Sequence, residues 1–376
     1  MVDKNFKLSY DDVMIVPEVT CRMSTRNACD CTDDNNMLPI FTAPMSTVVD
    51  EKSMVEFYRV GIHSVLPRTL DIETRRKYLF ESNKYNCFVA VSLTEFEDLF
   101  IYNYNTYERK IKARVCIDVA NGHMLRIIEL VKRAKSIHPD ICIMAGNIAN
   151  PQTYLEYDKV GVDYCRVGIG TGSGCLTSSN TGIHFPQFSL LEEIYRLKVS
   201  NKCKCKIVAD GGIKGYRDIQ KALVFADFVM IGGLFNKAID SAGELRYGNF
   251  YMNFFGKKIV NPVKTLLFKG KKVYNVTDKL IRKMKSGDVE LFKEFYGMST
   301  KKAQVAIGFS SGVSECKALK TSEGIVKTNK VEFTLEDWAK NERDYLKSAM
   351  SYTNSATLDE YKDSKYIVMN RIAFNN

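Results

Sequence analysis

Short apolar runs recur along this chain at nearly regular intervals, and this recurrence constrains the fold more than any other feature. Each run is short enough for a strand and too continuous for a strand with one solvated face, so each predicts a parallel strand covered on both sides. Segments with helical apolar spacing separate most of the runs, most clearly at residues 122–138, 187–197 and 216–225. The eight runs lie at residues 38–43, 61–66, 87–92, 113–119, 141–146, 164–170, 206–212 and 228–233.

Eight strands that alternate with helices predict an α/β fold, the (β/α)8 or TIM barrel. A doubly wound sheet is the structural alternative, but it would place its glycine-rich turn after the first strand. Here the glycines gather after the sixth, seventh and eighth runs, which favours the barrel. In barrels the chemistry lies at the C-terminal ends of the strands, and phosphate is often held after strands 7 and 8. Those ends are Asp210-Gly211-Gly212 and Gly232-Gly233.

No linker divides the chain, so we expect one catalytic domain over residues 1–376, with no inserted regulatory domain. After the eighth run we expect a long basic insertion at 246–294 and then a flap or active-site segment at 295–330. The formal net charge is +10, and the stretch from Arg246 to Glu294 contributes +8 of it, from 12 basic and 4 acidic residues. Such a stretch could dock an acidic partner, but a solvated lysine-rich excursion is the simpler interpretation, so nucleic acid is not an expected partner.

Membrane and metal functions are not expected. No apolar run approaches the length of about 20 residues that a membrane span requires, and the first residues, MVDKNFKLSYDD, lack the apolar stretch of a signal peptide. We therefore expect a cytoplasmic protein. Of the 11 cysteines, most sit singly in apolar runs, where a thiol acts as a small hydrophobe. The pairs Cys29/Cys31 and Cys203/Cys205 are C-x-C, and the four histidines lack metal-ligand spacing, so a zinc site is not predicted.

The densest chemical signal is the glycine-rich stretch GIGTGSGCLT at residues 168–177. Glycines let the backbone approach a ligand closely or wrap an ion with its carbonyls. Cys175 ends this stretch, and backbone amides beside it would favour its thiolate, so it is a candidate nucleophile with Thr177 as proton partner. A buried thiol in a tight turn is the alternative, and the two neighbouring phosphate-type turns favour the nucleophile.

Polar side chains also follow other runs at the expected ligand-binding face. Asp118 ends the fourth run and Asn147 follows the fifth, and each could either face a ligand or cap the next helix. Asp210 could accept hydrogen bonds from a ribose diol, while the adjacent glycine amides suit a phosphomonoester.

These motifs resemble the IMP dehydrogenase and GMP reductase family, and within it the reductase branch. The pieces that carry the resemblance span almost the whole chain in family order, and the cysteine stretch with its trailing TG and PQ is the most specific. They are LSYDDVMIVP (8–17), APMSTV (43–48), IDVANGH (117–123), MAGN (144–147), VGIGTGSGCLTSSNTGIHFPQ (167–187), ADGGI (209–213), DFVMIGGLF (227–235), FYGMS (295–299) and TSEG (321–324).

The resemblance implies a purine nucleotide across the barrel mouth, with GMP as substrate and IMP as product. It implies that Asp210 holds the ribose and that Cys175 bonds to purine C2 as a thioimidate, after which ammonia leaves and NADPH delivers hydride. Thr177 and Glu323 match the residues that relay protons. The remaining substrate contacts that it implies are Met45, Ser173, Gly211, Gly212, Ile231, Gly232, Gly233, Tyr296, Gly297, Met298 and Ser299.

The resemblance also implies the cofactor and cation sites. Asp118 and Asn147, with Ser241, Gly243 and Glu244 from the family's cofactor loop, match positions that bind NADPH. Backbone carbonyls of Gly170, Gly172 and Cys175 match a loop that binds a monovalent cation, K+. The family usually forms homotetramers, so we expect one here.

Two alternatives remain open. The first is IMP dehydrogenase, which oxidises IMP to XMP with NAD. Against it, only residues 67–86 separate the second and third runs, where dehydrogenases carry a regulatory domain, and no arginine lies between Ser299 and Thr321 to activate water. The second is a non-catalytic purine-nucleotide-binding or assembly protein, suggested by the unusual stretch NKAIDSAGE (236–244) and by the basic insertion.

Overall fold

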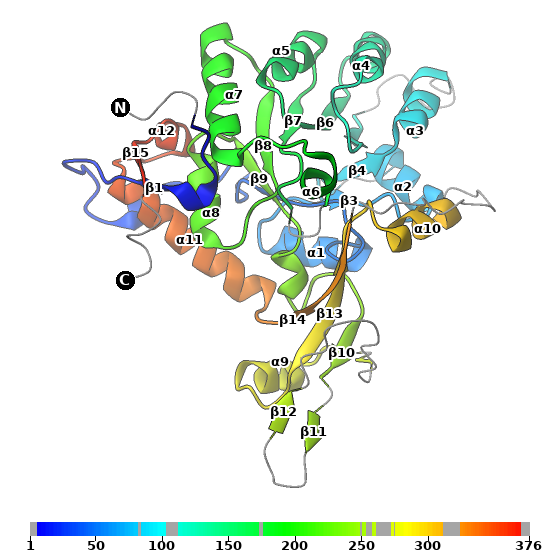
Figure 1. The fold of residues 1–376 in the computed structure, drawn as a ribbon, viewed down its shortest axis with the longest axis vertical. Helices are drawn as coiled ribbons and strands as arrows, with labels where there is room; N and C mark the ends of the chain where they lie inside the picture. Colours follow the sequence, from blue (N-terminus) through cyan, green and yellow to red (C-terminus); the bar gives the residue numbers. More distant parts are fainter. Residues whose placement is uncertain are drawn as a thin grey trace.

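A closed parallel sheet forms the centre of the molecule (Figure 1). The computed structural model describes residues 6–81, 84–102, 112–172, 176–248, 250–252, 258–260, 272–273, 275–310 and 324–369. The sheet order is β2-β9-β8-β7-β6-β5-β4-β3, and a parallel bridge between Phe41 and His63 joins its two ends. The predicted (β/α)8 barrel is therefore confirmed. Its strands are β2 (Ile40–Thr42), β3 (Val65–Leu66), β4 (Phe88–Val91), β5 (Arg114–Asp118), β6 (Cys142–Ile148), β7 (Tyr164–Val167), β8 (Lys206–Asp210) and β9 (Phe228–Ile231).

Helices surround this sheet and cover its outer face (Figure 1). Local signals fix their ends, as in α5, where the Asn150 side chain caps the first turn, Pro151 follows it and Gly161 ends the helix with φ 86°. The three helices predicted most clearly form as α4, α7 and α8, each within a few residues of the expected bounds. The covering helices are α1 (Glu51–Arg59), α2 (Ile72–Arg76), α3 (Leu93–Glu97), α4 (Leu125–Ile137), α5 (Pro151–Val160), α7 (Gln187–Asn201) and α8 (Tyr216–Leu223).

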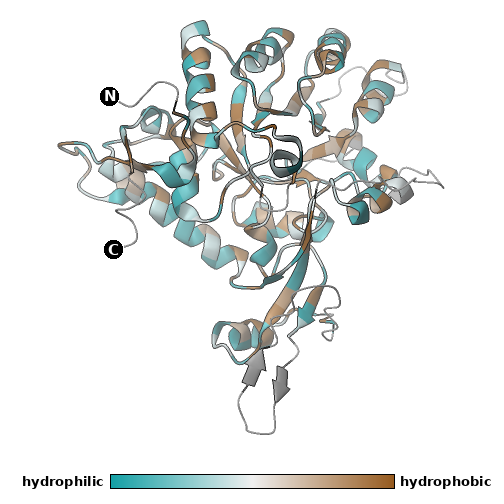
Figure 2. Cartoon of the chain, viewed as in Figure 1, coloured by the Kyte–Doolittle hydropathy of each residue, from teal (hydrophilic) through white to brown (hydrophobic). Residues whose placement is uncertain are grey.

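The apolar core has two layers, because each barrel strand is buried on both sides. Hydrophobic residues dominate the barrel strands in Figure 2, whereas the surrounding helices are hydrophobic on one side and hydrophilic on the other. Inside the barrel, the rings of Phe41, Phe88, Tyr164 and Phe228 pack edge-on or tilted against one another, with centroids 5.0–5.8 Å apart. This aromatic packing fills the barrel interior.

An antiparallel sheet projects from the barrel after β9 (Figure 1). Its order is β10 (Leu245–Tyr247), β13 (Leu291–Tyr296) and β14 (Val326–Lys330), and it carries the hairpin β11 (Phe250–Met252) and β12 (Lys258–Val260) and the helix α9 (Asp278–Lys285). We call these six elements the arm. Its own small apolar cluster comprises Ile239, Leu245, Leu280, Met284, Leu291 and Val331. We expected the basic insertion to end at residue 294 and the flap segment to begin at residue 295. Strand β13 spans this boundary, so the insertion and the flap segment belong to one sheet.

The remaining elements complete the chain around the barrel. The short α6 (Thr177–Thr181) and α10 (Lys301–Ser310) lie near the barrel mouth, while α11 (Leu335–Tyr352) and α12 (Leu358–Tyr361) lead to β15 (Tyr366–Val368). Strand β15 pairs with β1 (Val13–Ile15), which brings the two ends of the described chain together. Within the described ranges, no helix combines the length and apolar character that crossing a bilayer requires.

A buried polar pair lies at the opposite end of the barrel from the C-terminal strand ends. His63 Nε2 lies 2.7 Å from Asp33 Oδ2, and the Asp33 carboxylate also accepts the amides of Asn35 and Met37. Burial alone would raise the pKa of Asp33, but the hydrogen bonds from His63 and from these amides outweigh it and lower that pKa. A carboxyl group with a lowered folded-state pKa stabilises the fold above its unfolded pKa, and this contribution is lost as the pH falls through the folded pKa.

We therefore expect Asp33→Asn to lower the free energy of unfolding by about 1–3 kcal/mol near neutral pH, with the difference from wild type narrowing below about pH 4. Urea unfolding at a series of pH values measures this. Asp34→Asn, at an exposed neighbour, is the matched control and is expected to change stability by less than about 0.5 kcal/mol. A loss for Asp33→Asn that stays constant down to acid pH would contradict the assignment.

Candidate active site

A cavity of about 510 Å³ opens at the C-terminal ends of the barrel strands. This volume lies in the usual range for small-molecule and cofactor sites. The loops after β2, β3, β5, β7, β8 and β9 contribute to its wall, together with Asn147 of β6 and the segment that follows β13. The expected site residues that line it are Met45, Asp118, Asn147, Gly170, Gly172, Thr177, Asp210, Gly211, Gly212, Gly232, Gly233, Gly297, Met298 and Ser299.

Five other expected residues are not among those that line this cavity. Ile231 is buried within β9 and Tyr296 ends β13. The Ser241 hydroxyl is buried, where it donates to the carbonyl of Ala238, and the Glu244 carboxylate pairs with Arg246 and Lys272. Gly243, with φ 104°, lies between them in the turn that leads to β10.

Three expected residues, Ser173, Cys175 and Glu323, lie outside the described residues. The described chain does reach both sides of the cysteine stretch. Gly172 precedes it on the cavity wall, and Thr177 follows it there as the first residue of α6.

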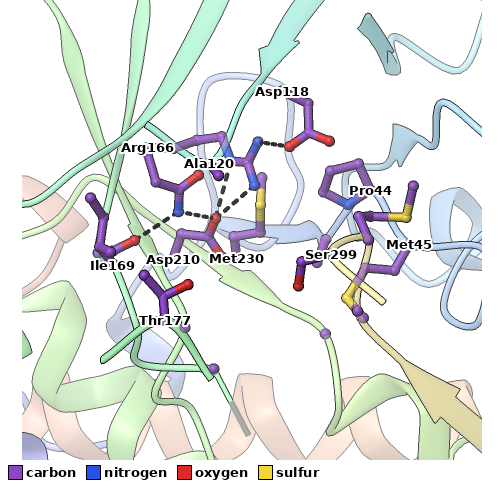
Figure 3. Close-up of a pocket in the computed structure, with 18 of the residues that line it drawn as sticks. Pro44, Met45, Asp118, Ala120, Arg166, Ile169, Thr177, Asp210, Met230 and Ser299 are labelled. Atoms are coloured by element: carbon purple, nitrogen blue, oxygen red, sulfur yellow. Dashed lines mark hydrogen bonds and ion pairs between the residues drawn. The ribbon is translucent and has the colours of Figure 1, made fainter. Parts of the chain in front are cut away.

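Arg166 holds two of the expected carboxylates together (Figure 3). It lies on β7 with 6% of its surface exposed, and its Nη1 donates to Asp118 Oδ1 at 2.7 Å. Its Nε and Nη2 both donate to Asp210 Oδ2, at 3.1 and 2.9 Å. Because β5, β7 and β8 end at the same rim, one guanidinium spans both carboxylates across the barrel interior.

The charges of this cluster are mutually stabilised. Burial lowers the pKa of Arg166, but the carboxylates of Asp210 and Asp118 outweigh it, so the pKa lies well above its usual range and the guanidinium stays charged. Burial also raises the pKa of the adjacent Cys116 thiol to about 12, which keeps that sulfur neutral. Cys116 is fully buried and is not among the residues that line the cavity.

The Asp210 carboxylate presents one oxygen to the cavity. Its Oδ2 accepts Arg166 and also the Asn147 amide, which lies 2.8 Å away and donates to the Gly168 carbonyl as well. Among the described residues, no hydrogen-bond donor reaches Oδ1. A polar ligand can therefore bind Oδ1 while Oδ2 stays fixed by the protein.

The turn at Gly211 and Gly212 brings the backbone close to the cavity. Gly211 and Gly212 have φ values of 94° and 78°, which side chains rarely adopt, and a Cβ on Gly211 would lie 2.2 Å from the Thr171 hydroxyl. Thr171 in turn donates to the Asp210 carbonyl, which ties the loop after β7 to the loop after β8. Backbone amides in such turns suit an anionic group.

Sequence reasoning missed Arg166 and Arg68. Both line the cavity, and Arg68 Nη1 donates to the Asp118 carbonyl at 3.3 Å. In the sequence, Arg166 is a single charged residue within an apolar run that predicts a buried strand. Because a buried arginine needs carboxylate partners, this position is a signal for a buried charge cluster. Arg68 follows β3 directly, at the end where ligands bind.

Further polar groups on the cavity wall come from Asp118, Asn147 and Arg68. The Gly170 carbonyl accepts the Ser178 hydroxyl at 3.2 Å, and Gly172 follows it on the wall. Nowhere in the described ranges do three His, Cys, Asp or Glu side chains gather as a metal site.

Comparisons with known proteins agree with this geometry. The model of the IMP dehydrogenase / GMP reductase domain matches residues 7–287. The GMP reductase of Bacillus subtilis is 31% identical over 255 residues, which cover 66% of this chain and 77% of the relative. The GMP reductase of Oceanobacillus iheyensis is 26% identical over 372 residues, or 97% of each chain, and that of Acidovorax sp. (strain JS42) is 29% identical over 282 residues, or 68% and 84%.

We expect Arg166→Met to lower the free energy of unfolding by about 3–5 kcal/mol, because it leaves two carboxylates close together without their shared cation. Arg126→Met is the matched control, since Arg126 pairs with Glu97 at the surface and its side chain is 55% exposed. Loss of that exposed pair is expected to cost at most about 1 kcal/mol. Urea unfolding of both variants measures the difference, and equal costs would contradict the role assigned to Arg166.

Proposed function

The chain belongs to the IMP dehydrogenase / GMP reductase family, and we propose that it acts as a GMP reductase that converts GMP to IMP and ammonia with NADPH. Its relatives make it an oxidoreductase of that family. One observation carries the choice of site: Asp118, Asn147, Thr177, Asp210 and the glycine turns, which are far apart in sequence, line a single cavity at the barrel mouth. Two sequence features favour the reductase over the dehydrogenase. The segment between β3 and β4 is too short for a regulatory domain, and residues 300–320 contain no arginine that could activate water.

We place the nucleotide phosphate at the glycine turns. The amides of Gly211, Gly212, Gly232 and Gly233, with Ser173, would hold the phosphate, and Ile231 would support the second turn from β9. Asp210 Oδ1 would accept a ribose hydroxyl, which agrees with the way that Arg166 and Asn147 occupy Oδ2. The purine would then lie against Met45, Met298 and Ser299, next to Tyr296 and Gly297.

We propose that the replacement of the purine 2-amino group by hydride takes place in two steps, each easier than a direct exchange. The Cys175 thiolate attacks purine C2 and forms a C–S bond, and the C2–N bond breaks as the amino group leaves as ammonia. Thr177 and Glu323 would pass the proton that the departing amine needs. A hydride then adds to C2, the C–S bond breaks and returns the electron pair to sulfur, and IMP is released.

The nicotinamide supplies that hydride when it is bound. Asp118 and Asn147 are proposed to orient it, with Gly243, Ser241 and Glu244 as the further cofactor residues that the family resemblance implies. A K+ ion at the carbonyls of Gly170, Gly172 and Cys175, a homotetramer and a cytoplasmic location belong to the same proposal and rest on that resemblance.

The direct test incubates the full-length protein with GMP and NADPH and follows NADPH absorbance and ammonia release. We expect both signals from wild type, and we expect Cys175→Ala to lower the rate by at least about 10³-fold, because the nucleophile is gone. Cys21→Ala is the matched control, since Cys21 is exposed and donates to the Ser351 carbonyl, away from the cavity. It should keep full activity.

Other outcomes would replace the proposal. Reduction of NAD in the presence of IMP, without loss of NADPH in the presence of GMP, would assign the chain to the dehydrogenase branch. Calorimetric binding of GMP with neither reaction would identify a non-catalytic nucleotide-binding protein. Unchanged turnover by Cys175→Ala would refute the covalent mechanism.

A further inference from the structure

A buried lysine lies at the base of the arm, outside the cavity. Lys293 on β13 is 1% exposed, and its ammonium donates to the backbone carbonyls of Ala238, Ile239 and Ser241 at 2.7, 3.1 and 2.6 Å. It also lies 3.0 Å from the Ser241 hydroxyl. All four oxygens belong to the turn at residues 238–241, which follows the short 3-10 helix Phe235–Lys237, so one side chain fixes that turn against β13.

A second buried side chain joins the same elements. Asn236, also in the segment after β9, donates to the carbonyls of Thr47 and Glu294 at 2.7 and 3.1 Å. Its own side-chain oxygen accepts the Asn329 amide of β14 at 2.8 Å. We call Lys293, Asn236, Ser241 and Asn329 the polar joint.

The polar joint lies close in sequence to three parts of the cavity wall. Gly232 and Gly233 precede Asn236 by a few residues, and the backbone N–H of Asn236 donates a hydrogen bond to the Gly232 carbonyl. Met45 precedes Thr47, whose hydroxyl also donates to the Tyr296 carbonyl at 3.4 Å. Gly297, Met298 and Ser299 follow Lys293 directly along the chain after β13. Figure 3 shows Met45 and Ser299 on the same side of the cavity.

The energetics of Lys293 do not favour a role in stability alone. No carboxylate contacts its ammonium among the described residues, and burial lowers its pKa to about 7 even though Asp240 and Asp50 partly oppose this. A buried charge that has only carbonyl partners is costly to desolvate. What this side chain adds is a defined position, because its donors fix the turn at residues 238–241 against β13.

We propose that Lys293 is a positioning residue, which acts through the turn at residues 238–241 and, together with Asn236, holds the purine-contacting segment Gly297–Ser299 in register with the phosphate-binding Gly232 and Gly233. This inference rests on the proposed function for the identity of the ligand. The polar joint would also separate the cavity from movements of the arm, because it fixes β13 at the point where the arm meets the barrel.

The test compares Lys293→Met with Lys362→Met. Lys362 is the matched control, because its ammonium also donates to backbone carbonyls, those of Leu223 and Ala226, but at the opposite end of the barrel. The KM for GMP, kcat and the GMP dissociation constant from calorimetry are measured well below each unfolding midpoint. We expect Lys293→Met to raise the KM and dissociation constant for GMP about tenfold or more, since small displacements of contact residues have effects of this size. Lys362→Met should change only the unfolding midpoint.

A less disruptive substitution keeps the test valid if Lys293→Met does not fold. Asn329→Ala removes one hydrogen bond of the polar joint at a half-buried position, and a rise of about threefold in the KM for GMP is expected. Unchanged GMP binding in Asn329→Ala and in folded Lys293→Met, or an equal rise in Lys362→Met, would overturn the positioning role. If wild type binds GMP but does not turn it over, the proposed function fails, while the dissociation constants still decide the role of Lys293.

Discussion

Closure of a parallel sheet is the constraint on which the rest of this structure depends. Since all eight strands run in one direction, every loop that follows a strand opens on the same rim. The bridge between Phe41 and His63 closes the ring, and the aromatic side chains beneath fill its interior. The cavity opens at this rim, and residues from position 43 to position 304 meet there.

Charge balance then decides how that rim can be used. Asp118 and Asp210 come from strands that are not neighbours, and their like charges repel each other at the rim. Arg166, on a strand between them, offsets both charges. It also occupies one oxygen of Asp210 and leaves the other oriented into the cavity, so the same contact that stabilises the barrel interior prepares a hydrogen-bond acceptor for a ligand.

The sequence predicted the barrel well because strand burial on both faces leaves continuous apolar runs, a signal that is local. Asp118, Asn147 and Asp210 were found for the same reason, since each stands at the end of such a run. Arg166 was missed because its partners are distant in sequence. The arm sheet was missed as well, because β13 pairs with β14 across 30 to 38 residues of sequence, and no local pattern encodes such a pairing. Ser241 illustrates the limit, because its bond with Lys293 depends on that long-range pairing.

The arm raises the question of how a barrel accommodates a long insertion at the rim of its own cavity. An insertion that was free to move would disturb the cavity wall, because β13 runs directly into Gly297, Met298 and Ser299. The apolar cluster around Leu245, Leu280 and Leu291 includes Ile239 from the segment after β9, and Phe295 of β13 packs into the main core, so apolar contacts join the arm to the barrel. The hydrogen bonds to the carbonyls at residues 238–241 add direction to this attachment, because a satisfied polar network specifies one position. The length and charge of the arm can therefore vary beyond this attachment, while the residues on the barrel side of the attachment are constrained by the cavity that they line.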